Sequence, residues 1–338
     1  MLEMKPRWRT LLLFLFGAVV LVLMVSYTVY TPVSEAVTHI RPYPHSIKCP
    51  QSLSSMGNAS GRIMHDGGIF FMETSEQTNP SFQVMCAVES AAITHPNTKV
   101  TVLMKGLSNR THPSLGLSFL SCFPNVEFAP MNLREVFADT PLSGWYTSVE
   151  ENREFCDLPI LADACRLAVL WRSGGVYLDT DFIIFKNLEN VTNALGKQSP
   201  YTLNGAILSF HTHHPFIERC MEDFVNRYNY WFYGHQGPQL FTRVFKRWCS
   251  IQRLRDSDGC KGVNILPKKA FYPVDWQEWR KFFRTISQWE LEELLRNSYG
   301  IHLWNKKTQG ARPIDGSFLD QLQTRFCPET HKLMKMHL

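Results

Sequence analysis

The segment that most constrains the fold runs from Gly174 to Asp181 and reads Gly-Gly-Val-Tyr-Leu-Asp-Thr-Asp. The glycine pair follows an amphipathic pattern that predicts a helix over residues 157–172, and the apolar residues after the pair predict a short strand. Because residues two apart on an extended segment point to the same side, Asp179 and Asp181 should converge beyond the carboxyl end of this strand. Open α/β sheets bind their ligands at that edge, so the sequence predicts a binding site there.

Two carboxylates at one strand end repel each other unless a positive group lies between them. A hard divalent cation that also binds a diphosphate meets this need, because it prefers oxygen ligands. The Asp-x-Asp pattern alone arises often by chance, but the Gly-Gly-Val-Tyr-Leu run directly before it makes the match specific. The sequence therefore predicts Asp179 and Asp181 as metal ligands.

The remaining pattern predicts one large α/β domain. Strands are expected at 68–73, 100–104, 125–128 and 176–178, as a pair within 199–211, and at 299–304. Helices are expected after Pro80, at 157–172, near 215–229 and 238–249, through most of the aromatic segment 276–295, and at the end of the chain. This alternation of strand and helix is typical of a parallel sheet.

The N-terminal part predicts a membrane anchor. Basic residues precede a mostly apolar, uncharged run over residues 11–30, and about 20 such residues can span a bilayer. The basic flank should stay cytoplasmic. The expected order is a cytoplasmic tail over 1–10, a signal anchor over 11–30, a flexible stem over 31–66 and a luminal domain over 67–338. The alternative is a cleaved signal peptide, although its apolar core usually spans only ~7–15 residues.

Features of the remaining chain agree with a luminal location. Acceptor triplets for N-glycosylation occur at Asn58, Asn109 and Asn190. All nine cysteines lie between Cys49 and Cys327, and an oxidising lumen permits disulfides. The odd count leaves at least one thiol outside any intrachain pair. Cys249 and Cys260 bracket a polar stretch and are the best candidates for a local bridge, with two buried thiols as the alternative.

The formal net charge of +5 is mild and suits a protein that binds an anionic nucleotide. The chain contains no Lys/Arg run and no basic stripe interleaved with aromatic residues, so nucleic acid is not an expected partner.

Asp163 and Arg166 form a second candidate group, because residues three apart share a helix face. One interpretation is a surface ion pair of little energetic value. In the other interpretation, this face looks into the cleft beside the aspartates. Arg166 would then bind phosphate or sugar oxygens, and Asp163 would bind a sugar hydroxyl.

His302 and Trp304 are expected on one side of the last strand, directly before Asn305, Lys306 and Lys307. The imidazole of His302 is a candidate third metal ligand, and a lysine is a candidate phosphate ligand. The alternative is a structural histidine without a ligand.

Two further segments allow a functional and a structural interpretation. The loop 234–239 contains Gln236 and opens a helix, so it is either an ordinary turn or a wall of a sugar pocket. The aromatic side chains of the segment 276–295 are either core or a surface that faces an acceptor or a membrane. They are Trp276, Trp279, Phe282, Phe283 and Trp289.

The string from Asp163 through Phe182 resembles the Golgi α1,4-glycosyltransferases with an Asp-x-Asp motif. Matching segments lie at 71–75, 104–107, 139–142, 235–240 and 303–307, so the resemblance covers nearly the whole expected luminal part. Within the family, residues 204–206 and 334–336 favour the galactosyltransferase branch over the N-acetylglucosaminyltransferase. Cys165 departs from the family pattern, which usually has serine there.

The resemblance implies an α/β fold of GT-A type, a Rossmann-like nucleotide-sugar-binding domain behind a transmembrane signal anchor in the Golgi membrane. It implies UDP-galactose as donor, Mn²⁺ as metal, and the 4-OH of a terminal β-galactose as acceptor, on lactosylceramide or another glycan. The α linkage means that configuration is retained, and front-face and double displacement both stay open. Assembly with other copies or with other glycosyltransferases is a further implied possibility.

The resemblance also assigns roles to residues. Catalytic roles fall to Asp163, Arg166, Asp179, Asp181 and Gln236, and metal binding to Asp179, Asp181 and His302. Donor binding falls to Glu73, Thr74, Tyr177, Asp179, Trp304 and Lys306. Two other classes of protein remain as alternatives. One is an aspartyl-phosphate phosphatase, whose nucleophile motif also follows an apolar strand, and the other is a non-catalytic luminal lectin.

Overall fold

The computed structural model describes residues 49–50, 67–107, 114–152, 156–254, 257–308 and 313–337. The expected anchor 11–30, nearly all of the expected stem, and the sequons at Asn58 and Asn109 lie outside these residues. Within the described part, no helix is both long enough and apolar enough to cross a bilayer. Asn190, the remaining sequon, is described and exposed.

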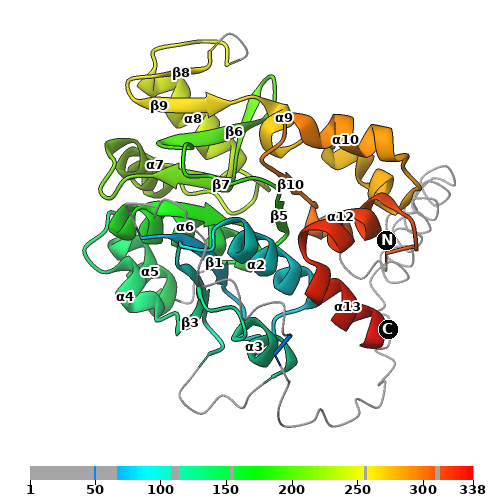
Figure 1. Ribbon diagram of the computed structural model, residues 1–338. Helices are drawn as coiled ribbons and strands as arrows, with labels where there is room; N and C mark the ends of the chain where they lie inside the picture. Colours follow the sequence, from blue (N-terminus) through cyan, green and yellow to red (C-terminus); the bar gives the residue numbers. More distant parts are fainter. Residues whose placement is uncertain are drawn as a thin grey trace, which may run out of the picture. The chain divides into compact units, whose positions relative to one another are not determined.

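A mixed eight-stranded sheet forms the centre of the domain, in the order β3-β2-β1-β4-β7-β6-β9-β8 (Figure 1). Its strands are β1 Ile69–Glu73, β2 Val100–Met104, β3 Val126–Pro130, β4 Gly175–Leu178, β6 Ala194–Ser199, β7 Thr202–Phe210, β8 Gly259–Cys260 and β9 Val263–Leu266. The expected α/β class is confirmed, but the expected parallel sheet is only half right. Strands β3, β2, β1 and β4 are parallel, whereas β7 runs antiparallel to β4.

Helices cover both faces of this sheet. Alternate residues of β1 point to opposite faces, so Ile69 and Phe71 join one core with α2, while Phe70 and Met72 join the other core with α6. Strands of this type are apolar throughout because both faces are buried. The helices of the domain are α2 Phe82–Thr94, α3 Leu115–Leu120, α4 Leu133–Phe137, α5 Ser143–Asn152, α6 Leu158–Ser173, α7 Pro215–Asn226, α8 Pro238–Trp248, α9 Lys268–Phe271, α10 Gln288–Arg296, α11 Asn305–Thr308, α12 Phe318–Phe326 and α13 Pro328–His337.

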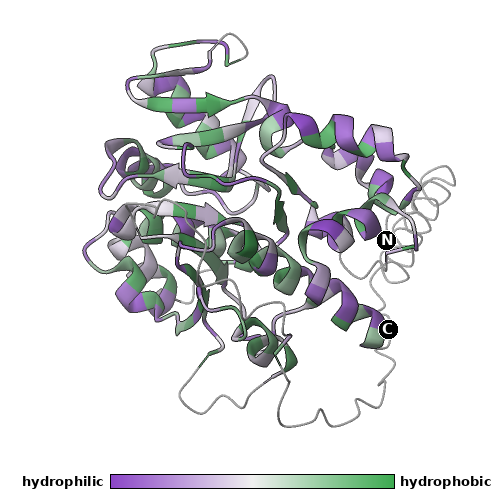
Figure 2. Ribbon diagram, in the orientation of Figure 1, coloured by the Kyte–Doolittle hydropathy of each residue, from purple (hydrophilic) through white to green (hydrophobic). Residues whose placement is uncertain are grey.

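Figure 2 shows the resulting hydropathy pattern, with hydrophobic strands at the centre and hydrophilic turns on the outer helices α10, α12 and α13.

Local sequence signals explain where α6 ends and β4 begins. Asp157 caps α6 by accepting a hydrogen bond from the Ile160 amide, and Gly174 follows the last turn with a φ of 63°. Gly175 has a φ of +92°, and a Cβ on it would overlap the backbone of Gly68 on the neighbouring strand. The glycine pair therefore allows a sharp turn from the helix into a strand packed directly against β1.

A second, two-stranded sheet brings the C-terminal part of the chain to the end of β4. Strand β5, Phe182–Ile184, follows the aspartates directly and pairs antiparallel with β10, Gly300–His302. In this register His302 lies opposite Phe182. The pairing therefore places His302 beside Asp181, although more than a hundred residues separate them in sequence.

Several predicted boundaries need correction. The helix after Pro80 begins at Phe82, because Ser81 is its cap. The last strand ends at His302, and Trp304 lies beyond it with a φ of 58°. The segment 276–295 divides into a 3₁₀ helix over Trp276–Phe283 and the helix α10, which Ser287 caps. Of the strand pair expected within 199–211, only β7 lies there, because β6 spans Ala194–Ser199. Strands β5, β8 and β9 and the helices α3, α4, α5, α9 and α11 were not predicted.

Three disulfides tie the described residues together: Cys49–Cys122, Cys86–Cys327 and Cys249–Cys260. The predicted local bridge between Cys249 and Cys260 is confirmed. Cys156, Cys165 and Cys220 remain free, in agreement with the odd count. The bond between Cys49 and Cys122 attaches the expected stem to the short segment that follows α3.

Candidate functional site

The two aspartates occupy the connection between β4 and β5, at the carboxyl end of β4. The backbone of this turn is fixed by hydrogen bonds, from the Asp179 amide to the Ala206 carbonyl (2.8 Å) and from the Phe182 amide to the Asp179 carbonyl (3.2 Å). The first bond attaches the turn to β7. The predicted position of both side chains at the end of an apolar strand is therefore confirmed.

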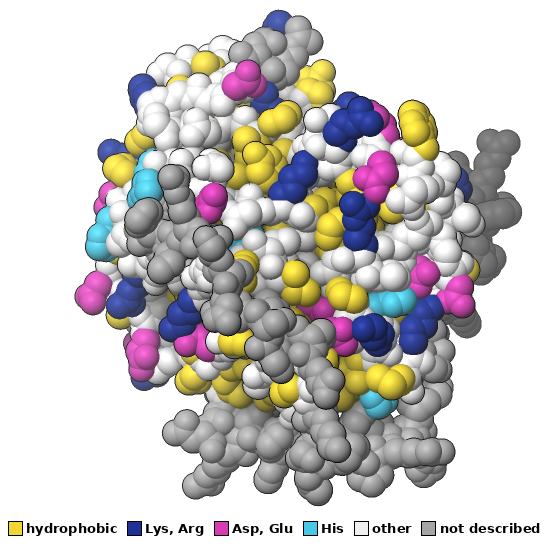
Figure 3. Space-filling view, in the orientation of Figure 1, with side chains coloured by type: hydrophobic (Ala, Val, Ile, Leu, Met, Phe, Trp, Pro, Cys, Tyr) yellow, Lys and Arg dark blue, Asp and Glu magenta, His cyan; other side chains and the backbone are white. Residues whose placement is uncertain are grey.

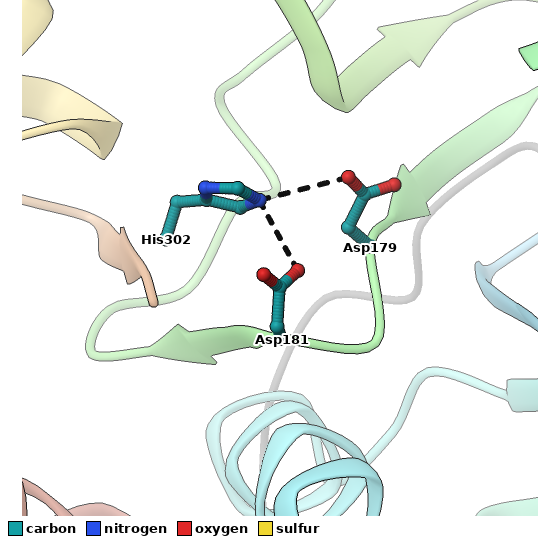
Figure 4. A group of neighbouring side chains, drawn as sticks. All are labelled: Asp179, Asp181 and His302. Atoms are coloured by element: carbon teal, nitrogen blue, oxygen red, sulfur yellow. Dashed lines mark ion pairs between the residues drawn. The ribbon is translucent and has the colours of Figure 1, made fainter. Parts of the chain in front are cut away.

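His302 completes a compact group with Asp179 and Asp181 (Figure 4). Its Nε2 lies 3.1 Å from Oδ1 of Asp181 and 3.6 Å from Oδ2 of Asp179. One ligand atom from each of the three residues lies within 4.8 Å of the others. Asp181 and His302 are buried and Asp179 is partly accessible, so the group opens to solvent on the side of Asp179.

The segment after β10 wraps around Asp181. The amide of Asn305 donates to Oδ2 of Asp181 (2.6 Å), and the amide of Leu303 donates to the Asp181 carbonyl (2.9 Å). One carboxylate oxygen of Asp181 is thereby committed to the backbone, while the other faces His302.

Side chains from α6 and β4 contact the carboxylate oxygen of Asp179 that does not face His302. The Tyr177 hydroxyl donates to Oδ1 of Asp179 (2.5 Å), and Nη1 of Arg166 lies 3.1 Å from the same oxygen. Arg166 also donates to the Gly205 carbonyl (2.8 Å) and pairs with Asp163 (3.2 Å). Because Arg166 is buried, the interpretation of Asp163 and Arg166 as a surface ion pair is wrong.

The charges of the site shift its pKa values. Burial alone would raise the pKa of Asp179, but the Arg166 guanidinium and the His302 imidazole lower it below its usual value. Burial works against the charged form of His302, yet Asp181 and Asp179 raise its pKa to about 9. Burial raises the pKa of Asp163 to about 6 against the opposing effect of Arg166. The site is therefore built to hold positive charge between its carboxylates.

Two carboxylates and one imidazole are a suitable ligand set for a divalent cation. Two buried polar atoms around the group, Nδ1 of His302 and Oδ1 of Asn305, have no hydrogen-bond partner among the described residues. Buried polar atoms normally have partners, so these two atoms remain available to a group that the protein itself does not supply. The residues present thus fit a metal ion.

Other expected site residues lie around this group. Glu73 ends β1, the strand next to β4, and its Oε1 accepts a hydrogen bond from the Ser75 amide (2.9 Å). Thr74 follows it and is buried. Because parallel strands end at the same edge of a sheet, Glu73 and Thr74 share that edge with Asp179.

Trp304 lies behind His302 and is buried. Its indole N–H donates to the Val274 carbonyl (2.9 Å), and its ring lies 4.4 Å from the His302 ring in an edge-to-face arrangement. Tyr272, which the sequence analysis missed, packs fully buried against both rings, at 5.7 Å from Trp304 and 5.9 Å from His302. No sequence signal marks Tyr272, because its neighbours come from distant segments.

The loop before α8 borders the site at Asp163. Gln236 is buried, and its Nε2 donates to the Phe224 carbonyl (2.8 Å) while its Oε1 has no partner among the described residues. A Cβ on Gly237 would lie 2.8 Å from Oδ2 of Asp163, so this loop packs on Asp163. Nζ of Lys306 lies 3.7 Å above the ring of Tyr233, another residue that the sequence analysis did not select.

The aromatic segment 276–295 is divided between the two interpretations. Phe282 is fully buried, and Trp279 and Phe283 pack partly buried against the same core. Trp276 and Trp289 are exposed. Three of the five aromatic side chains therefore pack in or against the core, and two lie on the surface.

Two family profiles match most of the described domain. One is described as a glycosyltransferase sugar-binding region containing a DXD motif and matches residues 81–202. The other is described as an alpha 1,4-glycosyltransferase conserved region and matches residues 209–334. Between them they include Asp179, Asp181 and His302.

Curated relatives cover the same domain. The chain is 49% identical to lactosylceramide 4-alpha-galactosyltransferase of Rattus norvegicus, over 100% of this chain and 94% of that protein. It is 53% identical to the Homo sapiens protein of the same name, over 87% of this chain and 84% of that protein. It is 36% identical to the alpha-1,4-N-acetylglucosaminyltransferase of Homo sapiens, over 84% of this chain and 85% of that protein.

Among solved structures, the galactosyltransferase LgtC aligns with a TM-score of 0.42 and 14% identity, over 78% of this chain and 95% of that one. The two sequence comparisons agree with each other and extend over the whole described domain. The chain therefore belongs to the α1,4-glycosyltransferase family, whose members include lactosylceramide 4-alpha-galactosyltransferase.

Proposed function

We propose that this enzyme transfers galactose from UDP-galactose, in α1,4 linkage and with retention, to the terminal β-galactose of lactosylceramide. The observation that carries the proposal is the group of Asp179, Asp181 and His302 at the carboxyl end of β4. Higher identity to lactosylceramide 4-alpha-galactosyltransferases than to the N-acetylglucosaminyltransferase supports galactose as the transferred sugar.

Asp179, Asp181 and His302 are the proposed metal ligands, and Mn²⁺ is the proposed ion. A divalent cation bound there supplies Lewis-acid stabilisation of the charge that develops on the UDP leaving group. The backbone amide of Asn305 keeps the Asp181 carboxylate in one orientation, so that its second oxygen stays directed at His302. Trp304 and Tyr272 fix the plane of the imidazole by packing on it.

Arg166 has a different role in this proposal from the phosphate ligand expected initially. Its guanidinium already contacts Asp179, Asp163 and the carbonyls of Gly205 and Ala162. These contacts engage four of its five N–H donors, so Arg166 orients Asp179 and stabilises its ionised form. Asp163, which lies between Arg166 and the Gly237 loop, is the proposed ligand of a sugar hydroxyl, and Gln236 supports that wall of the pocket.

The donor is proposed to lie along the edge where β1 and β4 end. Glu73 ends the neighbouring strand there and Thr74 follows it, while the Tyr177 hydroxyl donates a hydrogen bond to Asp179. Lys306 on α11 follows Asn305, whose amide binds Asp181, and is the proposed diphosphate ligand. We assign this domain to the nucleotide-sugar-binding domains of GT-A type. The basic flank before the apolar run 11–30 supports the further proposal of a single-pass type II protein of the Golgi membrane, with tail, anchor and stem at 1–10, 11–30 and 31–66.

A donor and acceptor panel tests the proposed function. The full chain in detergent is incubated with UDP-galactose or UDP-N-acetylglucosamine, with lactosylceramide or an asialo-glycoprotein as acceptor, and the linkage of each product is determined. The proposal requires α1,4-linked galactose on lactosylceramide. Transfer of N-acetylglucosamine in its place would assign the enzyme to the other activity of the family.

A further inference from the structure

The connection between α7 and α8 carries a run of exposed aromatic side chains. Residues 230–233 read Tyr-Trp-Phe-Tyr and are called the aromatic loop below. The exposed fractions of Trp231, Phe232 and Tyr233 are 77%, 66% and 71%. Single exposed apolar residues are normal on a protein surface, but adjacent large ones mark an interaction site.

The base of the aromatic loop is fixed to the domain. His235 bonds to the Arg227 carbonyl through Nε2 (3.0 Å), and Arg243 donates to the His235 carbonyl (2.6 Å). The Trp231 amide donates to the Asn229 side chain (3.0 Å), and the Tyr230 and Trp231 rings pack at 4.7 Å. The rings are thus presented to solvent from a hydrogen-bonded base.

The aromatic loop also forms part of the rim of the site. Tyr233 contacts Lys306, the neighbour of the residue whose amide binds Asp181. Partial burial and the carboxylates of Asp163, Asp179 and Asp181 raise the pKa of Tyr233, which agrees with this position. The aromatic loop therefore borders the site on the side of Lys306.

The charge around the loop favours an amphipathic, weakly anionic partner. Residues 227–237 contain no acidic side chain. At the base, Arg227, Arg243 and Arg247 surround the single carboxylate of Asp223, which leaves a net positive charge. The face shown in Figure 3 carries hydrophobic side chains among both basic and acidic ones. Tryptophan and tyrosine beside basic residues are typical of surfaces that lie in a membrane interface.

We propose that the aromatic loop inserts into the headgroup layer of the membrane and sets the catalytic site against the bilayer that holds the acceptor. The proposal rests on the proposed function for the glycolipid nature of that acceptor. A disaccharide headgroup stands close to the bilayer surface, so the rim of an enzyme that modifies its outer sugar must approach the lipid. Phe232 is 66% exposed and its ring carries no polar atom, so the apolar part of a lipid layer suits it as the occupant.

The first test is physical and needs neither donor nor acceptor. The full chain is reconstituted into phosphatidylcholine vesicles with or without lipids brominated near the headgroup, which quench nearby tryptophan fluorescence. Trp231→Phe should lose a quenched component that the unmodified protein shows. Trp289→Phe is the matched control, because Trp289 is 73% exposed on a different element, α10. Equal quenching in the unmodified protein and in Trp231→Phe would overturn the proposal.

The second test separates lipid contact from sugar contact. The double variant Trp231→Ser, Phe232→Ser should raise the KM for lactosylceramide in vesicles roughly tenfold, because interfacial anchoring is lost. Turnover of soluble lactose should stay unchanged, which also shows that the variant is folded. Equal losses on both acceptors would mean that the rings bind the sugar, and unchanged kinetics on both would leave the loop without this role. Absence of galactosyl transfer in the unmodified protein would defeat the proposed function while the quenching result still stands.

Discussion

At the residue scale, Asp179 is the side chain on which most contacts of the site converge. Tyr177, Arg166 and His302 approach it from three elements: β4, α6 and β10. The position of Asp179 follows from the strand pattern, and so does that of Asp181. The contact between Asp179 and Arg166 could not be predicted from the sequence, because the pattern of a helix face does not show which strand that face covers.

We expect Arg166→Lys to weaken metal-dependent UDP binding by about 10–100-fold, the usual cost of losing a residue that orients a metal ligand. Lysine keeps the positive charge but cannot reach Asp163, Asp179 and the Gly205 carbonyl together. Titration of metal against UDP affinity measures the effect. An unchanged metal titration with lowered turnover would instead indicate that Arg166 acts on the substrate directly.

His302→Ala should weaken the same metal-dependent binding, because it removes the one imidazole from the group of three ligands. Trp304→Phe should leave the metal requirement intact and reduce thermal stability, since it removes only the hydrogen bond to Val274 and part of the packing. Isothermal titration and thermal melting of both variants check this pair. A normal metal titration for His302→Ala would remove His302 from the ligand set.

At the element scale, the end of α2 is held to the segment after β5 through one histidine. The Leu188 amide donates to Nε2 of His95 (2.8 Å), and Nδ1 of His95 bonds to the Ala91 carbonyl (3.0 Å). This arrangement requires a neutral ring. Burial lowers the pKa of His95 from 6.5 to about 4.

Stability should therefore fall as pH falls from about 6.5 to about 4. In this window the unfolded chain binds a proton at His95 and the folded chain does not, so protonation favours unfolding. The contribution of His95 corresponds to roughly 3 kcal/mol of unfolding free energy, present above pH 6.5 and lost at about pH 4. Denaturant unfolding at a series of pH values measures it. The His95→Gln variant should lack this component, and an identical slope in both proteins would refute the assignment.

Several elements that precede the aspartates were predictable, and the sheet topology was not. Apolar runs and the cap Asp157 mark β1, β2, β4 and α6 locally, whereas the start of α10 after Ser287 was missed. The antiparallel direction of β7 depends on where the chain travels after the aspartates, and no local pattern encodes that path. The same reason explains why the pairing of β5 with β10, which delivers His302, had to be observed.

At the scale of the whole molecule, the C-terminal helix α13 is fastened to the domain at its start. Cys327 bonds to Cys86 of α2, and the buried carboxylate of Glu89 accepts hydrogen bonds from the amides of Glu329 and Thr330. These contacts join residues separated by about two thirds of the chain. Family membership at this scale also removes the phosphatase alternative, because the Asp-x-Asp motif belongs to a sugar-transfer domain.

By loop entropy, removal of the bond between Cys86 and Cys327 should cost about 5.5 kcal/mol, whereas removal of the bond between Cys249 and Cys260 should cost about 3 kcal/mol. The first bond spans 241 residues and the second spans 11. Unfolding of the two double-alanine variants compares them. The reverse order of stabilities would show that native packing, rather than chain entropy, decides the effect.

The central claim is that Asp179 and Asp181 hold the metal on which galactosyl transfer depends. The most direct measurement is the rate of galactose transfer from UDP-galactose to lactosylceramide, with Mn²⁺ titrated, for the unmodified protein and for Asp181→Ala. The account predicts transfer that requires the metal in the unmodified protein. It also predicts loss of most activity in a variant that still folds and reaches the lumen. Near-normal transfer by Asp181→Ala would contradict it.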